Sequence, residues 1–167
     1  MVTVYAQIEE AAKQQDTNLG VLRQLLYVNA NLDPQTVLID YEQAAKSAIE
    51  EVFPNATLKG CFYYLSQNIY RKVQSAGLQA MYQRDSDFEI SIRMLAATAY
   101  IPEDEVIDAF EYLAQNMPYE ADPIVDYFEN NYIGRQRRHS RRAPRFPISM
   151  WNMHDRVIAN CREPTTT

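Results

Sequence analysis

Hydrophobic and polar positions follow two different periods over the first 77 residues. A run rich in β-branched and aromatic residues predicts a strand at 2–6, and two further short strands are predicted at 36–40 and 57–61. Apolar side chains at spacings of three and four predict helices between and after them, at 17–30, 41–53 and 62–75. Residues 1–77 are therefore expected to form a β-α-β-α-β-α segment.

No convincing strand pattern follows residue 77. Apolar residues at helical spacing, interrupted by Pro102, Pro118 and Pro123, divide residues 78–134 into helices, and Gly134 ends the last of them. The remainder is expected to comprise an arginine-rich loop, a C-terminal helix with its core at about 148–160, and a frayed tail, at 135–146, 147–161 and 162–167. The predicted fold class is α/β, with three short strands and their helices preceding an all-helical block.

Three strands are too few for a self-sufficient open sheet with helices on both faces. The sequence also begins inside the first predicted strand. We therefore expect the chain to be a piece of a larger protein. An exposed sheet edge would favour self-association.

The amino-acid composition is that of a globular protein and argues against several other classes of protein. Hydrophobic residues make up 47% of the 167 residues and charged residues 23%, as in globular proteins. Only 4 glycines occur and no glycine-rich phosphate-binding motif is present, so no nucleotide or other small-molecule cofactor is expected. The sequence has no apolar run long enough for a membrane span and no secretion signal, and with 2 cysteines we expect an intracellular chain with free thiols.

The net charge of −6 conceals a basic segment. Six arginines lie close together, Arg135, Arg137, Arg138, Arg141, Arg142 and Arg145. They could bind the phosphate backbone of DNA. Alternatively, the segment is a solvated loop, or it pairs with the acidic helices that precede it.

Asp40 directly follows an apolar run, at the end of a predicted strand. At that position a carboxylate could bind a hard metal ion such as Mg²⁺, as nucleotidyl-transfer sites require. The alternative is structural, because Asp is a preferred N-cap and Gln43 would complete a capping box.

Cys61 and Tyr64 have the spacing of a Cys-x-x-His zinc half-site, but tyrosine is not a usual zinc ligand. The two histidines, His139 and His154, could be combined with Cys61 and Cys161. Nothing in their spacing supports such a cluster, so a buried structural thiol is the preferred interpretation of Cys61.

Several segments, taken in order, resemble the transposase domain of Mutator-like elements (MULEs). They are residues 37–45, 48–49, 52–56 and 59–67, followed by 127–134, the arginine-rich stretch and 146–153, which resemble the version in animal elements. The resemblance implies a ribonuclease-H-like core with an inserted helical block. It also implies an Asp-Asp-Glu triad that binds two Mg²⁺ or Mn²⁺ ions, and cut-and-paste movement of DNA.

Asp40 matches the second aspartate of that triad. The first aspartate would belong to a strand upstream of residue 1, and the glutamate to a motif expected where the chain ends; Glu163 precedes that motif position. Tyr64 stands where the family has histidine, so the Cys-x-x-His signature that includes Cys61 is degenerate.

We therefore expect a partial, degenerate transposase copy that lacks two of three catalytic carboxylates and has no catalysis of its own, with Mg²⁺ or Mn²⁺ not tightly bound. The alternative is a domesticated DNA-binding or protein-interaction module without catalysis, and a third possibility is an α/β domain with an unrelated role. DNA is the expected partner, and the nucleus is the expected location if the transposase interpretation holds.

Overall fold

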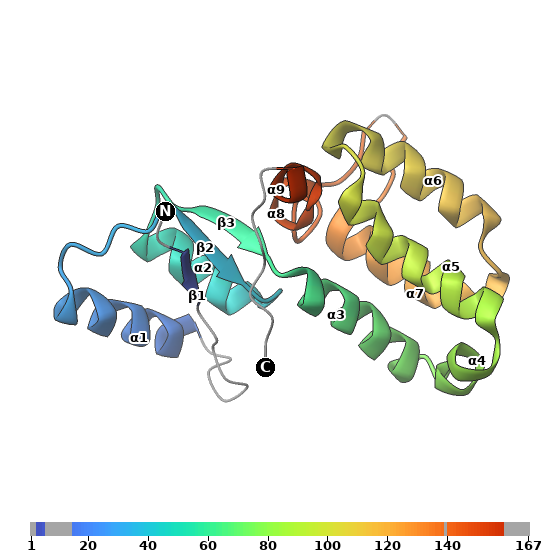
Figure 1. Cartoon of the computed structure of the whole chain (residues 1–167), viewed down its shortest axis with the longest axis horizontal. Coiled ribbons are helices and arrows are strands. Elements are labelled where there is room, and N and C mark those ends of the chain that lie inside the picture. The colour runs from blue at the N-terminus through green and yellow to red at the C-terminus, as the bar shows by residue number, and fades with distance from the viewer. Residues whose placement is uncertain (1–2, 6–14, 139, 159–167) are drawn as a thin grey trace. The chain divides into compact units, whose positions relative to one another are not determined.

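The computed structural model describes residues 3–5, 15–138 and 140–158 (Figure 1). The chain divides into two compact units, Met1–Cys61 and Phe62–Thr167. The first contains the strands and the second is helical. The prediction of a mixed α/β chain with a helical second part is confirmed.

The first unit is a parallel sheet with two helices. Its elements are β1 (Thr3–Tyr5), α1 (Gln15–Val28), β2 (Thr36–Ile39), α2 (Gln43–Val52) and β3 (Thr57–Gly60). The strand order is β1-β2-β3, so β2 is central, and its residues Val37, Leu38 and Ile39 are all buried. Such a continuous apolar run is typical of a parallel strand covered on both faces. The helix α2 buries Ala45, Ala48 and Ile49, and α1 packs against it.

Parallel register aligns the ends of β2 and β3. Ile39 is paired with Gly60, and the Cys61 amide extends the ladder by donating to the Ile39 carbonyl at 3.1 Å. Beside this pair, the buried Tyr41 ring lies against Gly60: a Cβ on Gly60 would come within 2.6 Å of Tyr41 Cζ. Gly60 is therefore required by a close approach rather than by an unusual backbone conformation.

The second unit consists of short helices joined by 3-10 turns. Its α-helices are α3 (Phe62–Ser75), α4 (Gln79–Arg84), α5 (Ser86–Ala97), α6 (Val106–Asn116), α7 (Asp122–Phe128), α8 (Ile148–Trp151) and α9 (His154–Ile158). A π-helical turn, η5 (Glu129–Ile133), continues α7. The helix α3 packs against α5 and α7, and α5 against α6, as Figure 1 shows. Among the described residues, no helix combines the length and hydrophobicity needed to cross a bilayer.

Aromatic residues form the centre of the second unit. The Tyr132 ring lies 5.2 Å from Phe128, 5.7 Å from Phe146 and 6.2 Å from Trp151, measured between centroids. Trp151 and Tyr132 are fully buried, and the Trp151 indole donates a hydrogen bond to the Tyr132 carbonyl at 3.2 Å. This cluster joins η5 to α7, α8 and the segment that leads into α8.

The prediction of one continuous helix over 148–160 is wrong. The helix α8 ends at Trp151, and α9 begins at His154. The break is stabilised by Asn152, whose side-chain oxygen accepts from the His154 amide at 3.0 Å and whose side-chain nitrogen donates to the Ile101 carbonyl at 2.8 Å. The Met153 amide also donates to Ala99. These bonds compensate for the helical bonds that the break removes.

We predict that Gly60→Ala destabilises the protein by about 1–3 kcal/mol, because the added methyl group must displace the buried Tyr41 ring. Gly20→Ala is the matched control: its Cβ meets no atom within 4 Å and Gly20 lies inside α1, so it should stabilise by about 0.5–1 kcal/mol. Urea unfolding followed by far-UV circular dichroism measures both. Equal effects of the two substitutions would contradict the packing account.

We predict that Trp151→Ala destabilises the second unit by about 3–5 kcal/mol, because it leaves a cavity in the aromatic cluster. Since Trp151 is the single tryptophan, unfolding must be followed by circular dichroism instead of tryptophan fluorescence. Tyr112→Ala serves as the comparison: its side chain is 68% exposed, and a change within about 0.5 kcal/mol is expected. A loss below 1 kcal/mol for Trp151→Ala would show that this cluster is not the core.

Candidate catalytic strand end and nucleic-acid interface

Asp40 lies at the carboxyl end of the central strand β2, as the sequence predicted. In the register of the sheet, Asp40 and Cys61 each follow the aligned pair Ile39–Gly60. The Asp40 carboxylate is half-buried and accepts a hydrogen bond from the Glu42 amide at 3.3 Å. This bond to the residue two positions on is the contact of an Asx turn, which leads the chain out of the sheet.

The predicted capping box of Asp40 and Gln43 is wrong. The helix α2 begins at Gln43, and its N-cap is Glu42, which makes no side-chain capping hydrogen bond. The helix thus begins two residues later than predicted, after Tyr41, whose ring lies against Gly60. Asp40 is therefore a strand-end carboxylate and not the cap of the following helix.

Cys61 and Tyr64 fall on different units. Cys61 is buried at the end of the first unit. Tyr64 belongs to the first turn of α3 in the second unit, where its ring makes an edge contact with Tyr63 at a centroid distance of 5.4 Å. Aromatic packing against Tyr63 is therefore the contact that the structure shows for the Tyr64 ring.

The family resemblance implies a bound metal ion, which would need a cluster of ligating side chains. No group of three or more His, Cys, Asp or Glu side chains that could hold a metal ion occurs in residues 3–5, 15–138 and 140–158. His154 lies 2.9 Å from Asp155, its neighbour in α9, and His139, Cys161 and Glu163 lie outside the described residues. Asp40 and its described surroundings do not by themselves fit a two-metal site, which needs several carboxylates.

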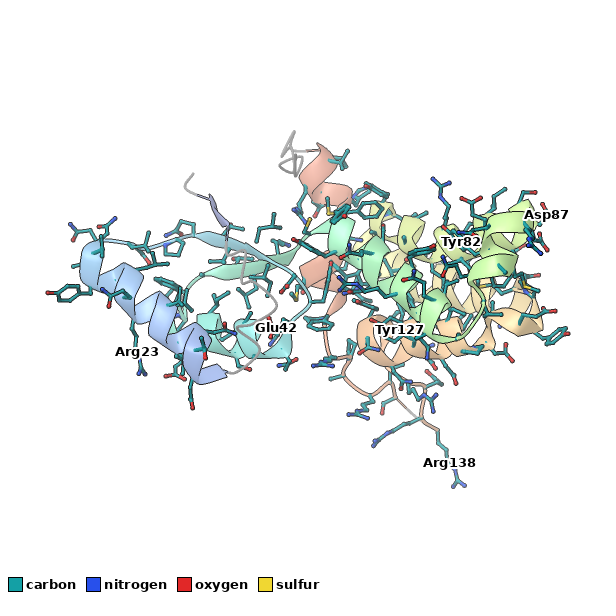
Figure 2. The ribbon with its side chains drawn as sticks, turned by 90° about the horizontal axis from the view of Figure 1, so that it is seen from below. Arg23, Glu42, Tyr82, Asp87, Tyr127 and Arg138 are labelled. Atoms are coloured by element: carbon teal, nitrogen blue, oxygen red, sulfur yellow. The ribbon has the colours of Figure 1, made fainter. Side chains whose placement is uncertain are left out.

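The arginine-rich segment begins with a hairpin in the second unit. We name residues 135–142 the arginine hairpin. Gln136 and Arg141 form an antiparallel bridge, the Arg137 amide donates to the Ser140 carbonyl at 2.7 Å, and the Arg142 amide donates to Arg135 at 2.9 Å. Figure 2 shows Arg138 extending away from the helices at the end of this hairpin.

Glu129, in the π-helical turn, binds both sides of the hairpin base. Its carboxylate accepts from Arg141 at 3.1 Å and from the Gln136 amide at 3.3 Å, and it lies 4.0 Å from Arg135. Arg141 also pairs with Glu111 of α6 and donates to the Gly134 carbonyl at 2.6 Å. Its side chain is only 15% exposed, so Arg141 is part of the protein's own structure.

Gly134 allows the end of the hairpin, at Arg142, to pass close to the backbone at the start of the hairpin. Its φ of +91° lies in the region that favours glycine, and an added Cβ would overlap the Arg142 carbonyl oxygen. The Phe146 amide closes the loop by donating to the Asn131 carbonyl at 2.8 Å. The sequence predicted Gly134 as a helix end but not this crossing.

The six predicted arginines therefore separate into different roles. Arg141 and Arg135 pair with acids of the preceding helices, the latter also with Asp126 at 3.1 Å, so the predicted pairing with acidic helices is confirmed for these two. Arg145 lies over the Phe146 ring, 5.5 Å from its centroid. The side chains of Arg137, Arg138 and Arg142 are exposed and form no ion pair with the described residues.

Comparison with known proteins gave one family match. The family model described as MULE transposase domain matches residues 9–68, a range that includes Asp40, Cys61 and Tyr64. The similar segments from residue 127 onward lie outside the matched range. No curated protein and no solved structure matches the chain. Residues 9–68 of this chain are thus similar to a MULE transposase domain.

Proposed function

We propose that this chain is part of a MULE-type DNA transposase in which Asp40 is one metal-binding, catalytic carboxylate, and that the chain alone does not cleave or join DNA. The observation that carries the proposal is the family match over residues 9–68, within which Asp40 follows a central parallel strand. In open α/β sheets, ligands bind outside the carboxyl ends of the strands.

A ribonuclease-H-like core is part of the same proposal. Parallel pairing of β2 with both neighbours, and the position of Asp40 after β2, are compatible with such a core. In the intact family site, Mg²⁺ or Mn²⁺ would be held by three carboxylates and would stabilise the attacking and leaving oxygens of an in-line displacement. Here Asp40 would supply one of the three, and the protein would act on DNA in the nucleus.

The proposed lack of independent catalysis rests on ligand number. Hard divalent ions bind through several oxygen ligands, and two such ions need more than one carboxylate. Asp40 is the residue that matches a triad position, and no cluster of potential metal ligands accompanies it in the described ranges. The partners of Asp40 would have to come from other parts of the transposase or from another molecule.

We predict that the chain does not nick or linearise supercoiled plasmid in the presence of Mn²⁺. Agarose electrophoresis should give the same product pattern for the wild-type chain, for Asp40→Asn and for buffer alone. Asp40→Asn preserves the shape of the side chain and removes its charge. Cleavage by the wild-type chain that disappears in Asp40→Asn would show that the chain holds a complete site, and it would overturn the proposal.

The second candidate function is a DNA-binding module without catalysis. The arginine hairpin favours it, because three of its guanidinium groups are exposed and pair with no acidic side chain among the described residues. Guanidinium groups bind phosphate oxygens through paired hydrogen bonds. This candidate requires no further carboxylates and does not depend on the first.

If the second candidate is correct, the whole chain should bind a fluorescently labelled DNA duplex with an affinity that falls steeply as salt rises. Phosphate contacts release counterions, so the logarithm of the binding constant should decrease linearly with the logarithm of the salt concentration. Fluorescence anisotropy between about 50 and 200 mM NaCl measures this dependence. Absence of binding at the lowest salt concentration would remove this candidate.

A further inference from the structure

We propose that the arginine hairpin is a preformed binding element for the backbone of duplex DNA, in which Arg137, Arg138 and Arg142 contact phosphates while Arg141 positions the hairpin. The inference rests on the second candidate function and deepens it, because it assigns different tasks to arginines that the sequence does not distinguish. The surface comprises three exposed guanidinium groups, and its partner is a polyanion with regularly spaced phosphates.

The acids near the hairpin compensate the charges of only some of its arginines. Glu111, Asp126 and Glu129 approach the hairpin, and all three pair with Arg135 or Arg141. These acids leave the charges of Arg137, Arg138 and Arg142 uncompensated by any described side chain. The local surplus is positive although the whole chain has a net charge of −6. A polyanion would therefore be attracted to the exposed arginines of the hairpin.

The hairpin is held in one conformation before any ligand binds. Backbone hydrogen bonds cross the hairpin from Arg137 to Ser140 and from Arg142 to Arg135, and Glu129 holds its base. A flexible arginine segment would lose conformational entropy when it bound DNA, whereas a hairpin that is already formed loses less. The π-helical turn that supplies Glu129 is a rare structure that often occurs at functional sites.

The side chains of the hairpin favour a phosphate-bearing partner over a membrane. Residues 135–142 contain no apolar side chain, so the hairpin has nothing to insert into the acyl region of a membrane. A planar guanidinium matches the geometry of phosphate oxygens. The family match to a transposase domain favours DNA as the source of those phosphates. Backbone contacts of this kind carry no sequence information, so the binding should not depend on base sequence.

The first test compares two triple variants of the whole chain. Arg137→Ala/Arg138→Ala/Arg142→Ala should weaken duplex binding at least tenfold at about 100 mM NaCl and reduce the salt slope by about two to three. The matched control is Arg71→Ala/Arg84→Ala/Arg93→Ala, which removes the same charge from exposed positions on α3, α4 and α5. The control should retain the wild-type slope. An equal loss of binding in the two variants would overturn the assignment, since net charge alone would then explain it.

The second test separates positioning from charge. Glu129→Gln removes a negative charge beside the hairpin, so electrostatics alone predicts tighter DNA binding. We expect several-fold weaker binding instead, because the hairpin loses its charged anchor. Asp108→Asn removes an equal charge from an exposed position on α6, and among the described residues Asp108 forms no ion pair with the hairpin, so this substitution should not weaken binding. Tighter binding by Glu129→Gln would overturn the positioning role of its partner Arg141.

Hydrogen exchange provides a readout independent of DNA. In Glu129→Gln and in Arg141→Ala, the amides of Arg137 and Arg142 should exchange faster than in the wild-type chain, while far-UV circular dichroism remains unchanged. Unchanged exchange would show that the hairpin does not need the anchor.

The outcomes distinguish this inference from the function on which it rests. If the wild-type chain does not bind the duplex, the second candidate function fails together with the inference. If it binds and the hairpin triple variant binds equally well, only the inference fails. Binding to vesicles containing phosphatidylserine, or to a polyglutamate peptide, in preference to the duplex would also overturn the choice of partner.

Discussion

The second unit is organised by the complete burial of Tyr132. Its ring is surrounded by Phe128, Phe146 and Trp151, and its hydroxyl accepts a hydrogen bond from Asn68 of α3 at 3.4 Å. Burial raises the pKa of the Tyr132 hydroxyl above its ordinary value, so the group stays neutral. Because Tyr132 belongs to the π-helical turn, its burial fixes the orientation of the whole turn. The positions of the residues on either side of Tyr132, including Glu129, follow from that orientation.

The fixed position of Glu129 explains why an arginine-rich segment adopts a defined shape. An isolated ion pair on a protein surface contributes only about 0.2–1 kcal/mol. Here one carboxylate receives a side chain and a backbone amide, and Arg141 is shielded by Glu111 and the Gly134 carbonyl. Shared, partly buried contacts of this kind reinforce one another. Arg135 and Arg141 form the ion pairs that hold the hairpin. Arg137, Arg138 and Arg142 are exposed and form no ion pair with the described residues.

The sequence predicted β2 from a continuous apolar run at 36–40, and it predicted helices such as α3, at 62–75, from apolar residues at helical spacing. It could not predict the break at Asn152, since that break depends on partners near Ala99 and Ile101 that are distant in sequence. For the same reason, the sequence could not show which arginines form ion pairs and which are exposed. The acids that pair with Arg135 and Arg141 become their neighbours only in the folded chain. The position of Asp40 after a strand was predictable because it depends on local pattern alone.

The residues around Asp40 occupy their positions for different physical reasons. Packing accounts for Gly60, because the Tyr41 ring leaves no room for a side chain, and burial accounts for Cys61. Capping would have accounted for Asp40, but the N-cap of α2 is Glu42. The contact from Asp40 to the Glu42 amide is long, at 3.3 Å, and serves a turn that an asparagine could also form. The contact of Asp40 therefore serves the turn that leads from β2 towards α2, and it depends on a side-chain oxygen rather than on a charge.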